Sequence, residues 1–399
     1  MDRFDVVPEA AIVDGTATDA YFRRTEEALA AAGRDPTVVA EVTLRQFPGE
    51  DKGEGEGESE SERGDHRVFA GVKDVAHLLA GRTVDADAVR EGQLFSGGPV
   101  LRVEGRYREF APLETSLLGF LSQASAFATR ALKARLAAPT SRVISFGTRH
   151  LHPGVAACLE RSALVGGLDG ISHVAAGERI GVEAGGTMPH ALLLCFGEGE
   201  QEAAWRAFDE AVGPDVPRVA LCDTFADEAT EAVRAAEAVP DLDGVRLDTT
   251  GSRRGDFRQI VREVRWELDQ HGHEDVDVFC SGGMTPAAMR RLRDVADGFG
   301  VGSYVTDADP LNFGLDVVEV DGQPVAKRGR LPGKKELYRT DEGDQVALAD
   351  ADADTEGEDE SLLAPLVRDG EVVRKFDLDA AAARAVEDAE LFDVAAGGE

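Results

Sequence analysis

Residue types that can do chemistry follow a series of short β-rich runs in the middle of the chain. The runs occupy 142–147, 170–174, 179–186, 218–223, 244–248, 276–283 and 299–305. In parallel β/α folds, active sites gather where such strands end. The residues near these ends are cations, carboxylates, hydroxyls and glycines: Arg149, His150, Ser172, His173, Gly185, Gly186, Thr187, His190, Asp223, Arg246, Asp248, Ser281, Gly282, Gly283, Gly300, Gly302 and Ser303. This set suits a phosphorylated, polyanionic substrate.

Two glycine-rich segments, SGGM at 281–284 and FGVGS at 299–303, each follow or overlap the end of a run. Glycine has no Cβ, so its backbone N–H groups can approach phosphate oxygens closely. A lone pair of glycines is usually only a turn, but two such turns late in a barrel are typical of a phosphate site. We therefore predict phosphate contacts at Ser281, Gly282, Gly283, Gly300 and Gly302, and we assign Thr187 and Lys334 to the same phosphoribosyl- and phosphate-binding group.

His190 follows a glycine pair and Thr187 in the segment EAGGTMPHALLLCF, at a position expected to face a barrel mouth. An imidazole there can act as acid, base or nucleophile near neutral pH, although a structural histidine is the alternative. Arg246 and Asp248 share one face of their strand end, because strand side chains alternate. They are either a plain ion pair, or a cation for a carboxylate and an anion for ribose hydroxyls or Mg²⁺.

Helical segments follow most of the β-rich runs, and this alternation predicts parallel β/α units. About seven units without long breaks favour an irregular parallel β/α barrel, which we place at 113–305. Residues 114–137 are predicted to form one long helix, because Leu117, Leu121, Ala124, Ala128 and Leu132 recur at helical spacing. A second helix is expected at 18–33, capped by Thr18 or Asp19 and ended by Gly33.

The two ends of the chain contain antiparallel-looking strands, for example at 38–47 and 67–71. We predict that 1–112 and 306–399 form one discontinuous α+β domain, so that the chain as a whole belongs to the α/β class. Acidic stretches at 49–66 and 350–360 are expected to be solvated loops.

The formal net charge is −33, from 43 basic and 76 acidic residues, and most of the basic residues are arginines. Such a chain repels nucleic acid and anionic membranes, so neither is an expected partner. An acidic, lysine-poor composition is instead typical of proteins from a salt-rich cytosol, where salt screens self-repulsion. No apolar run is long enough to span a membrane and the N-terminus lacks a signal-like stretch, so we expect a cytoplasmic protein.

None of the four cysteines, Cys158, Cys195, Cys222 and Cys280, forms a CxxC pair. They are predicted to be free buried thiols, and their separation does not suit a zinc site.

Eight segments resemble nicotinate phosphoribosyltransferase, in the family's order. They are FAPLETSLLGFL (110–121), SFGTRHLHPG (145–154), GGLDGISHV (166–174), GGTMPHA (185–191), DGVRLDTTG (243–251), FCSGGM (279–284), FGVGS (299–303) and PGKKELYR (332–339). The resemblance covers most of the chain from about residue 18 to residue 378 apart from the acidic loops.

The resemblance implies that nicotinate and phosphoribosyl pyrophosphate give nicotinate mononucleotide and pyrophosphate, in NAD salvage. It also implies Mg²⁺ and coupled hydrolysis of ATP, with the histidine of a GT–x–x–H motif, here His190, phosphorylated. No metal ligand of the protein itself is expected. Tyr21 resembles the aromatic residue that stacks on the base in a neighbouring subunit, which implies a homodimer or a higher homo-oligomer.

Further roles follow from the same resemblance. Phe146 and Arg149 belong to the family's FG–x–R motif at the base site. Ser172 stands where the related nicotinamide enzyme carries Asp, and a neutral hydroxyl suits a carboxylate substrate better. Arg149, Arg246 and Ser172 are therefore expected to hold the nicotinate carboxylate, with Asp248 at the ribose or the metal. The basic residues Lys327, Arg328, Lys334 and Lys335 either neutralise pyrophosphate or form a solvated hairpin.

The sequence departs from the family at two positions. Ala191 follows the motif histidine where Ser is usual, and His150 follows Arg149 where a second Arg is usual. The role of position 150 is therefore open.

Four other functions were considered. A quinolinate phosphoribosyltransferase shares the fold type but lacks the GT–x–x–H context, and Ser172 argues against a preference for nicotinamide. An inactive ligand-binding homologue would be expected to lose His190 or Asp248, and both are present. An aldolase-like barrel would need a lysine at a strand end, and none of the seven runs ends in one.

Overall fold

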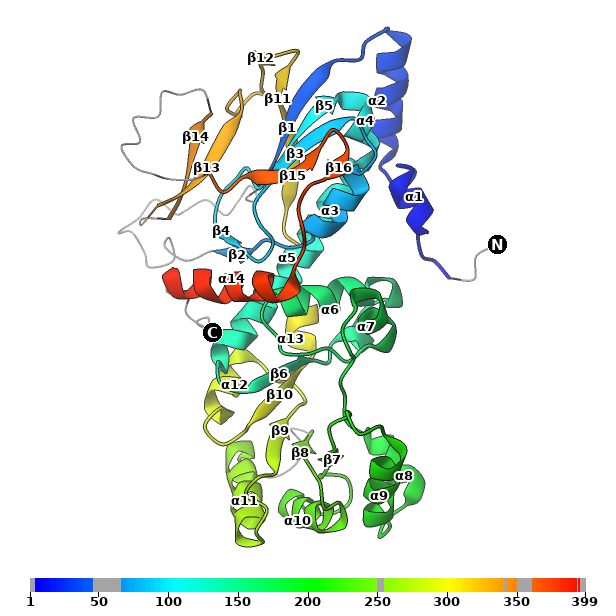
Figure 1. The fold of residues 1–399 in the computed structure, drawn as a ribbon, viewed down its shortest axis with the longest axis vertical. Helices are drawn as coiled ribbons and strands as arrows, with labels where there is room; N and C mark the ends of the chain where they lie inside the picture. The colour runs from blue at the N-terminus through cyan, green and yellow to red at the C-terminus, as the bar shows by residue number, and fades with distance from the viewer. Residues whose placement is uncertain are drawn as a thin grey trace. The chain divides into compact units, whose positions relative to one another are not determined.

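The computed structural model describes residues 4–45, 66–249, 255–340, 343–349, 361–392 and 394. Its contacts divide the chain into two compact units, one of Met1–Thr129 with Asp309–Val394 and one that contains Arg130–Ala308. Figure 1 colours the chain from end to end, so the first unit combines blue and cyan segments with orange and red ones. The predicted boundary at 112/113 precedes a long helix, whereas the division by contacts falls within it. The acidic stretches predicted at 49–66 and 350–360 lie outside the described residues, apart from His66.

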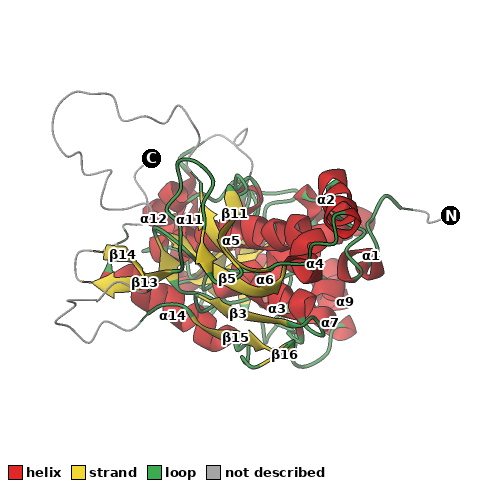
Figure 2. Ribbon diagram, turned by 90° about the horizontal axis from the view of Figure 1, so that it is seen from above, coloured by secondary structure: helices red, strands yellow, loops and turns green. Residues whose placement is uncertain are grey.

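The first unit is built on an antiparallel sheet of seven strands in the order β12-β11-β1-β5-β3-β15-β16. Strands from the two ends of the chain are neighbours in this sheet, since Val42 of β1 pairs with Leu315 of β11. Figure 2 shows β5, β3 and β15 in succession across it. The strands are β1 (Thr37–Leu44), β3 (Val84–Ala88), β5 (Leu101–Arg106), β11 (Phe313–Val320), β12 (Gln323–Pro324), β15 (Ala364–Arg368) and β16 (Glu371–Val372).

Two small sheets and several helices complete this unit. The small sheets pair β2 (Arg67–Val68) with β4 (Leu94–Phe95), and β13 (Lys335–Thr340) with β14 (Gly343–Leu348). The helices are α1 (Glu9–Val13), α2 (Ala20–Ala31), α3 (Val72–Leu79), α4 (Tyr107–Phe110), a 3-10 turn at Ala111–Leu113, and α14 (Leu378–Leu391).

Both helices predicted in the first part of the chain are present. Helix α2 is the one expected at 18–33; Asp19 is its N-cap by backbone geometry, but neither predicted cap residue supplies a side-chain capping bond. The long helix is α5 (Glu114–Ala137), and Leu117, Leu121, Ala124, Ala128 and Leu132 on it are all buried. The apolar spacing thus identified both the element and its buried face.

The second unit contains a parallel sheet of five strands in the order β6-β10-β9-β8-β7. They are β6 (Arg142–Ser145), β7 (Val219–Leu221), β8 (Gly244–Leu247), β9 (Asp277–Cys280) and β10 (Gly298–Val301). Beyond β6, two single parallel bridges, Ile144–Gly170 and Ile171–Ala184, extend the parallel pairing. The parallel α/β organisation is confirmed, while closure into a barrel stays a prediction, because in the described residues no pairing joins β7 to residue 184.

Helices follow the strands of this sheet, in part because the sequence supplies caps. Asp227, Asp256 and Thr285 accept the hydrogen bonds that begin α10, α11 and α12. The helices are α6 (Ala156–Val165), α7 (Val174–Ile180), α8 (His190–Phe196), α9 (Gln201–Ala211), α10 (Glu228–Ala238), α11 (Phe257–Gln270), α12 (Pro286–Leu292) and α13 (Ser303–Thr306). Short 3-10 turns lie at Thr148–His150 and Pro153–Val155.

Two predicted strands are largely wrong. Residues 170–174 contribute one bridge residue to each neighbour and then enter helix α7, which His173 caps by accepting from the N–H of Ala176. Residues 179–186 begin in that helix and contribute only the bridge at Ala184. The helix and its capping residue are therefore more stable here than a strand, although β-forming residues are common in these segments.

All four cysteines are free, but only Cys222 and Cys280 are buried; Cys158 is half-buried and Cys195 is exposed, so the prediction of four buried thiols is wrong. Burial raises the pKa of Cys280 to about 12, which keeps this thiol protonated. Within the described residues, no helix is both long and apolar enough to cross a membrane.

Candidate active site

A cavity of about 460 Å³ lies in the second unit, at the carboxyl ends of its parallel strands. It is bordered by residues that follow β6, β8, β9 and β10 and by the segment 185–189. Eleven of the predicted site residues line it: Phe146, Arg149, Ser172, Thr187, Arg246, Asp248, Ser281, Gly282, Gly283, Gly300 and Gly302. The rule that active sites lie at strand ends therefore brought together side chains that are far apart in the sequence.

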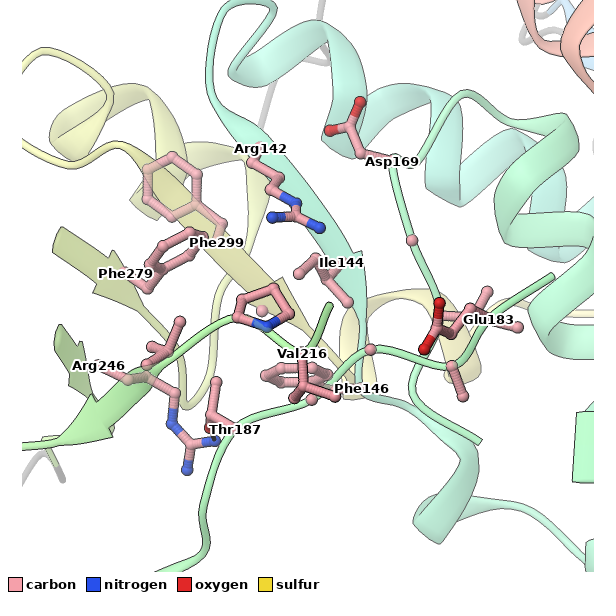
Figure 3. A pocket seen from close by; sticks show the side chains of 18 of the residues that line it. Arg142, Ile144, Phe146, Asp169, Glu183, Thr187, Val216, Arg246, Phe279 and Phe299 are labelled. Atoms are coloured by element: carbon pink, nitrogen blue, oxygen red, sulfur yellow. Dashed lines mark hydrogen bonds between the residues drawn. The ribbon is translucent and has the colours of Figure 1, made fainter. Parts of the chain in front are cut away.

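Arg246 is the central cation of this cavity. Its Nη1 donates a hydrogen bond to Thr187 Oγ1, and its Nη2 lies 3.7 Å from Asp248 Oδ2. The guanidinium also stands 5.9 Å from the centre of the Phe146 ring. Burial lowers the pKa of Arg246, while Asp248 and Asp223 oppose that shift. Figure 3 shows Arg246, Thr187 and Phe146 grouped at one end of a smaller neighbouring cavity, described below.

His190 is the first residue of α8; Pro189 before it lines the cavity, whereas His190 itself is not among the lining residues. A hydrogen bond of 3.1 Å joins His190 Nδ1 to Thr224 Oγ1. On the other side of the ring, His190 Nε2 lies 3.7 Å from Asp223 Oδ1. The imidazole is 38% exposed, so it is oriented by two partners and still open to a ligand.

Asp223 and Asp248 are linked through the backbone, since the N–H of Asp248 donates to Asp223 Oδ2 at 2.6 Å. The Asp223 side chain is only 4% exposed, and burial raises its pKa, although this N–H and His190 act in the opposite direction. Its Oδ1 accepts no hydrogen bond from the described residues; the buried Arg246 Nε donates none to them, and the buried Ser281 Oγ has no hydrogen-bond partner among them. Buried polar atoms are normally paired, so Arg246 Nε and Ser281 Oγ, whose residues line the cavity, are available to a polar ligand.

The two glycine segments differ in what they contribute. Gly282 and Gly283 form a left-handed turn with φ of 81° and 66°, as the prediction requires. A Cβ on Gly282 would stand 2.5 Å from Asp248 Oδ1. Gly300, in contrast, lies inside β10, where a Cβ would stand 2.4 Å from the Phe146 ring. Gly300 is therefore not part of a turn and makes room for an aromatic ring, whereas Gly302 follows the end of β10 and lines the cavity.

Arg149, His150 and Ser172 lie on the β6 side of the cavity. Arg149 Nε donates to His150 Nε2 at 3.4 Å, so the histidine that replaces the expected second arginine supports the first one. The backbone of Ser172 is fixed by Glu160, a fully buried carboxylate of α6 whose Oε1 accepts the N–H groups of Ser172 and His173 at 3.2 Å each. Burial raises the pKa of Glu160, and these N–H donors oppose that shift.

A second, inner cavity of about 210 Å³ borders the first one, and Phe146, Thr187 and Arg246 line both cavities. Figure 3 shows its apolar walls, in which Phe279 and Phe299 face Ile144 and Val216. Arg246 is the cation at the boundary. A flat apolar ring that carries a carboxylate would suit this end of the site, since ring and charge would each meet a matching surface.

Two predicted site residues, Tyr21 and Lys334, belong to the first unit. Tyr21 is 57% exposed on α2. Lys334 Nζ forms an ion pair of 2.9 Å with Glu104, and Lys335 Nζ is buried against Glu41 at the same distance. Lys335 is therefore part of an internal ion-pair network and does not belong to a solvated hairpin.

Some residues of the site were not assigned a role from the sequence. Asp223 is among the strand-end residues that the sequence singles out, but the sequence alone indicated no role for it. The sequence could not reveal a role for Thr224, Glu160 or Glu231. Their contacts join different elements of the fold, and no local spacing in the sequence indicates such contacts.

Comparisons with known proteins agree with this geometry. Two protein-family models match, the quinolinate phosphoribosyl transferase N-terminal domain over residues 19–125 and its C-terminal domain over residues 126–316. A nicotinate phosphoribosyltransferase of Mycobacterium tuberculosis is 34% identical over 64% of this chain. The aligned region spans 59% of that relative, which is less than two thirds of its length.

A solved structure gives a match over the full length. The nicotinate-nucleotide pyrophosphorylase of Pyrococcus furiosus is 42% identical, covers 98% of this chain and 99% of its own, and has a TM-score of 0.87. The chain belongs to the family of quinolinate and nicotinate phosphoribosyltransferases. Human nicotinic acid phosphoribosyltransferase, at 22% identity, 94% coverage of both chains and a TM-score of 0.70, shows the same fold.

Membership of this family accounts for the resemblance of the eight sequence segments. It does not choose between the bases that the family's members use, because the two family models carry the name of quinolinate enzymes and the curated relative that of a nicotinate enzyme.

Proposed function

We propose that this protein transfers the phosphoribosyl group of phosphoribosyl pyrophosphate to nicotinate, which yields nicotinate mononucleotide and pyrophosphate for NAD synthesis. The observation that carries the proposal is one cavity that combines two arginines and the Phe146 ring with a left-handed glycine turn and the carboxylate of Asp248.

Nicotinate binding is assigned to the β6 and β8 side of the cavity. The ring lies against Phe146, and its carboxylate meets Arg149, Arg246 and the Ser172 hydroxyl. Arg246 supports this role because its Nε has no partner within the described residues while Thr187 fixes another of its nitrogens. A charged carboxylate offsets the cost of holding this guanidinium in a buried position.

Phosphoribosyl pyrophosphate occupies the opposite side, with its 5′-phosphate on the backbone N–H groups of Gly282 and Gly283 and near Ser281. Asp248 faces the ribose hydroxyls. Pyrophosphate leaves C1 of the ribose, an oxocarbenium-like centre forms, and the ring nitrogen of nicotinate attacks it. The protein contributes positioning and fixed charges to this step.

Mg²⁺ fits this site as an ion that arrives with the pyrophosphate. It usually takes one or two carboxylates in addition to substrate phosphates, and Asp248, which lines the cavity, is the carboxylate that would hold it. Among the described residues, no cluster of three or more His, Cys, Asp and Glu side chains forms a metal site of its own. When bound, Mg²⁺ supplies positive charge to the leaving pyrophosphate.

ATP hydrolysis is coupled to synthesis through His190, which receives the γ-phosphoryl group. Thr224 is hydrogen-bonded to Nδ1, while Asp223 stands 3.7 Å from Nε2, so Nε2 is the nitrogen that can accept a phosphoryl group. The phosphoramidate is hydrolysed during turnover, so that one phosphate is released for each nucleotide made.

Two further expectations complete the proposal. A second copy of the chain supplies Tyr21 to the base site, and the large exposed fraction of this ring supports such a role. The protein works in a salt-rich cytoplasm, for which its net charge of −33 is the supporting observation.

Quinolinate is the alternative base, and the names of the two matching family models favour it. Quinolinate carries a second carboxylate that leaves as carbon dioxide, so it needs additional cations around the ring. His150 is the candidate for that second contact, because it lines the cavity beside Arg149.

A parallel assay distinguishes the bases. Purified protein in molar KCl receives phosphoribosyl pyrophosphate, Mg²⁺ and ATP with nicotinate, nicotinamide or quinolinate, and the mononucleotide and any carbon dioxide are measured. We expect nicotinate to give the highest kcat/KM without release of carbon dioxide. A higher kcat/KM with quinolinate, accompanied by carbon dioxide, would replace the proposal by the alternative.

A further inference from the structure

The loop between β7 and α10 is organised by one carboxylate, that of Glu231. Its Oε1 accepts the N–H groups of Phe225 and Ala226 at 3.0 Å each, and its Oε2 accepts the N–H of Thr224 at 2.9 Å. The side chain is fully buried. Three consecutive backbone donors therefore converge on a single side chain from the following helix.

The chemistry of these contacts requires a carboxylate. A fourth donor, Gln201 Nε2 of α9, reaches Glu231 Oε1 at 3.2 Å, so all of its partners are donors. A carboxylate only accepts hydrogen bonds, whereas an amide would turn an NH₂ group toward one of these donors. In the described part of the chain no cation forms a salt bridge with Glu231, so neutral N–H groups carry the stabilisation of this buried charge.

The loop that Glu231 holds carries the two partners of His190. Thr224, whose N–H donates to Glu231, uses its hydroxyl in the 3.1 Å hydrogen bond with His190 Nδ1. Asp223, the preceding residue, stands 3.7 Å from His190 Nε2. A change in the path of residues 224–226 therefore moves both groups that orient the imidazole.

We propose that Glu231 is a positioning residue that acts through Thr224 and Asp223 to hold His190 in the orientation needed for phosphoryl transfer. The inference rests on the proposed function of His190 as the phosphoryl acceptor. Glu231 itself is fully buried and bonded to the loop, so its contribution is to geometry.

Glu160 provides a matched comparison. It is also a fully buried carboxylate that accepts consecutive backbone N–H groups, but those belong to Ser172 and His173 on the base side of the cavity. Glu160→Gln and Glu231→Gln thus remove the same charge from equally buried sites, and they differ in the loop that each releases.

The experiment compares the wild type with these two variants in molar KCl. The first measurement is the NMR signal of the His190 ring, identified by its loss in His190→Ala. We expect the signal to shift in Glu231→Gln and to keep its wild-type position in Glu160→Gln. The second measurement is synthesis of the mononucleotide with and without ATP.

In Glu231→Gln the ATP-stimulated rate is expected to fall by about 10- to 100-fold, the size of loss that a small misplacement of a reacting group produces. The ATP-independent rate should stay within a factor of about two, since the base and phosphate sites are untouched. Glu160→Gln should instead raise KM for nicotinate. An unshifted His190 signal in a folded Glu231→Gln protein, or equal loss of both rates, would overturn the inference.

If Glu231→Gln does not fold, Gln201→Met decides the question. It leaves the three backbone donors in place but removes the side-chain donor to Glu231, and we expect the same shift of the His190 signal at a smaller size. A wild-type signal in Gln201→Met would then count against the inference. Failure of the proposed function has a different signature, because the wild type itself would then show no stimulation by ATP.

Discussion

Two features require glycine at position 282. The backbone is left-handed there, and the carboxylate of Asp248 leaves no room for a side chain. Its φ is 81°, and an added Cβ would come within 2.5 Å of Asp248 Oδ1. The carboxylate is the movable partner in this contact, so a methyl group would displace it from the ribose site. Gly282→Ala should therefore reduce kcat/KM by about 100-fold, as expected for a displaced group in the site.

Gly272 supplies the control for this substitution. Its φ is also 81°, but an added Cβ would meet no atom within 4 Å. Both alanine variants should lose about 1–2 kcal/mol of unfolding free energy from the left-handed backbone, measured by urea denaturation. Only Gly282→Ala should lose activity, and an equally active Gly282→Ala enzyme would remove Asp248 from the ribose site.

Ser172 sets the charge at the base site in the proposed function. Ser172→Asp places a second negative charge beside the nicotinate carboxylate, and such pairs near 4 Å repel by about 1–4 kcal/mol in polar surroundings. KM for nicotinate should rise by about tenfold or more, while use of nicotinamide relative to nicotinate improves. Ser172→Asn is the neutral control, and steady-state kinetics with both bases is the measurement. An unchanged base preference in Ser172→Asp would exclude Ser172 from the pocket.

The helices and strands show why the sequence predicted some elements and missed others. Helix α5 has a long apolar stripe, so its spacing alone located Glu114–Ala137. The segment after β6 is harder, because 170–186 combines single bridges with the capped helix α7 and lacks a regular strand. Local patterns report periodicity within an element, whereas these residues are fixed by their neighbours in the fold.

The same limit applies to the site. Polar residues after β6, β8 and β9 were found because a strand end is visible in the sequence. Glu160 and Glu231 were not found. Each is a buried helix residue whose carboxylate accepts hydrogen bonds from a loop, which follows the helix for Glu160 and precedes it for Glu231. Gly300 was assigned to a turn because a glycine in a strand looks the same in sequence as one in a turn.

The first residue of α5, Glu114, gives an element-scale prediction about pH. Burial raises its pKa to about 7; Arg45 opposes this shift, and Asp316 and Asp19 add to it. A raised pKa means that the folded state binds the proton more tightly than the unfolded state. Stability is therefore lost as pH rises from about 4.5 to about 7, and the full cost remains at higher pH.

Glu114→Gln mimics the protonated form. At about pH 8.5 it should gain about 1–2 kcal/mol of unfolding free energy over the wild type, a figure reduced because solvent reaches part of the side chain. At about pH 4 the two proteins should be nearly equally stable, since the wild-type carboxyl is then largely protonated in both the folded and the unfolded state. Urea denaturation at both pH values is the measurement, and a gain that does not depend on pH would show that Glu114 is not the titrating group.

At the scale of the whole molecule, the net charge of −33 dominates. Near 1 M salt the Debye length is about 3 Å, and at 0.1 M it is about 10 Å, so repulsion between surface carboxylates extends further at low salt. The melting temperature should rise steeply with KCl between about 0.1 M and about 3 M. Deletion of 49–66 should weaken this dependence slightly and leave activity intact. A melting temperature insensitive to KCl would contradict adaptation to high salt.

The central claim concerns the whole catalytic cycle: one cavity makes nicotinate mononucleotide, and His190 couples that synthesis to ATP. The direct test measures initial rates of nicotinate mononucleotide formation and of phosphate release, with and without ATP, for the wild type and His190→Ala. We predict that ATP accelerates the wild type and is hydrolysed in step with product, while His190→Ala keeps a slow, ATP-independent synthesis and loses ATP hydrolysis. A wild type that makes no product from nicotinate, or a His190→Ala enzyme that still hydrolyses ATP in step with product, would contradict the account.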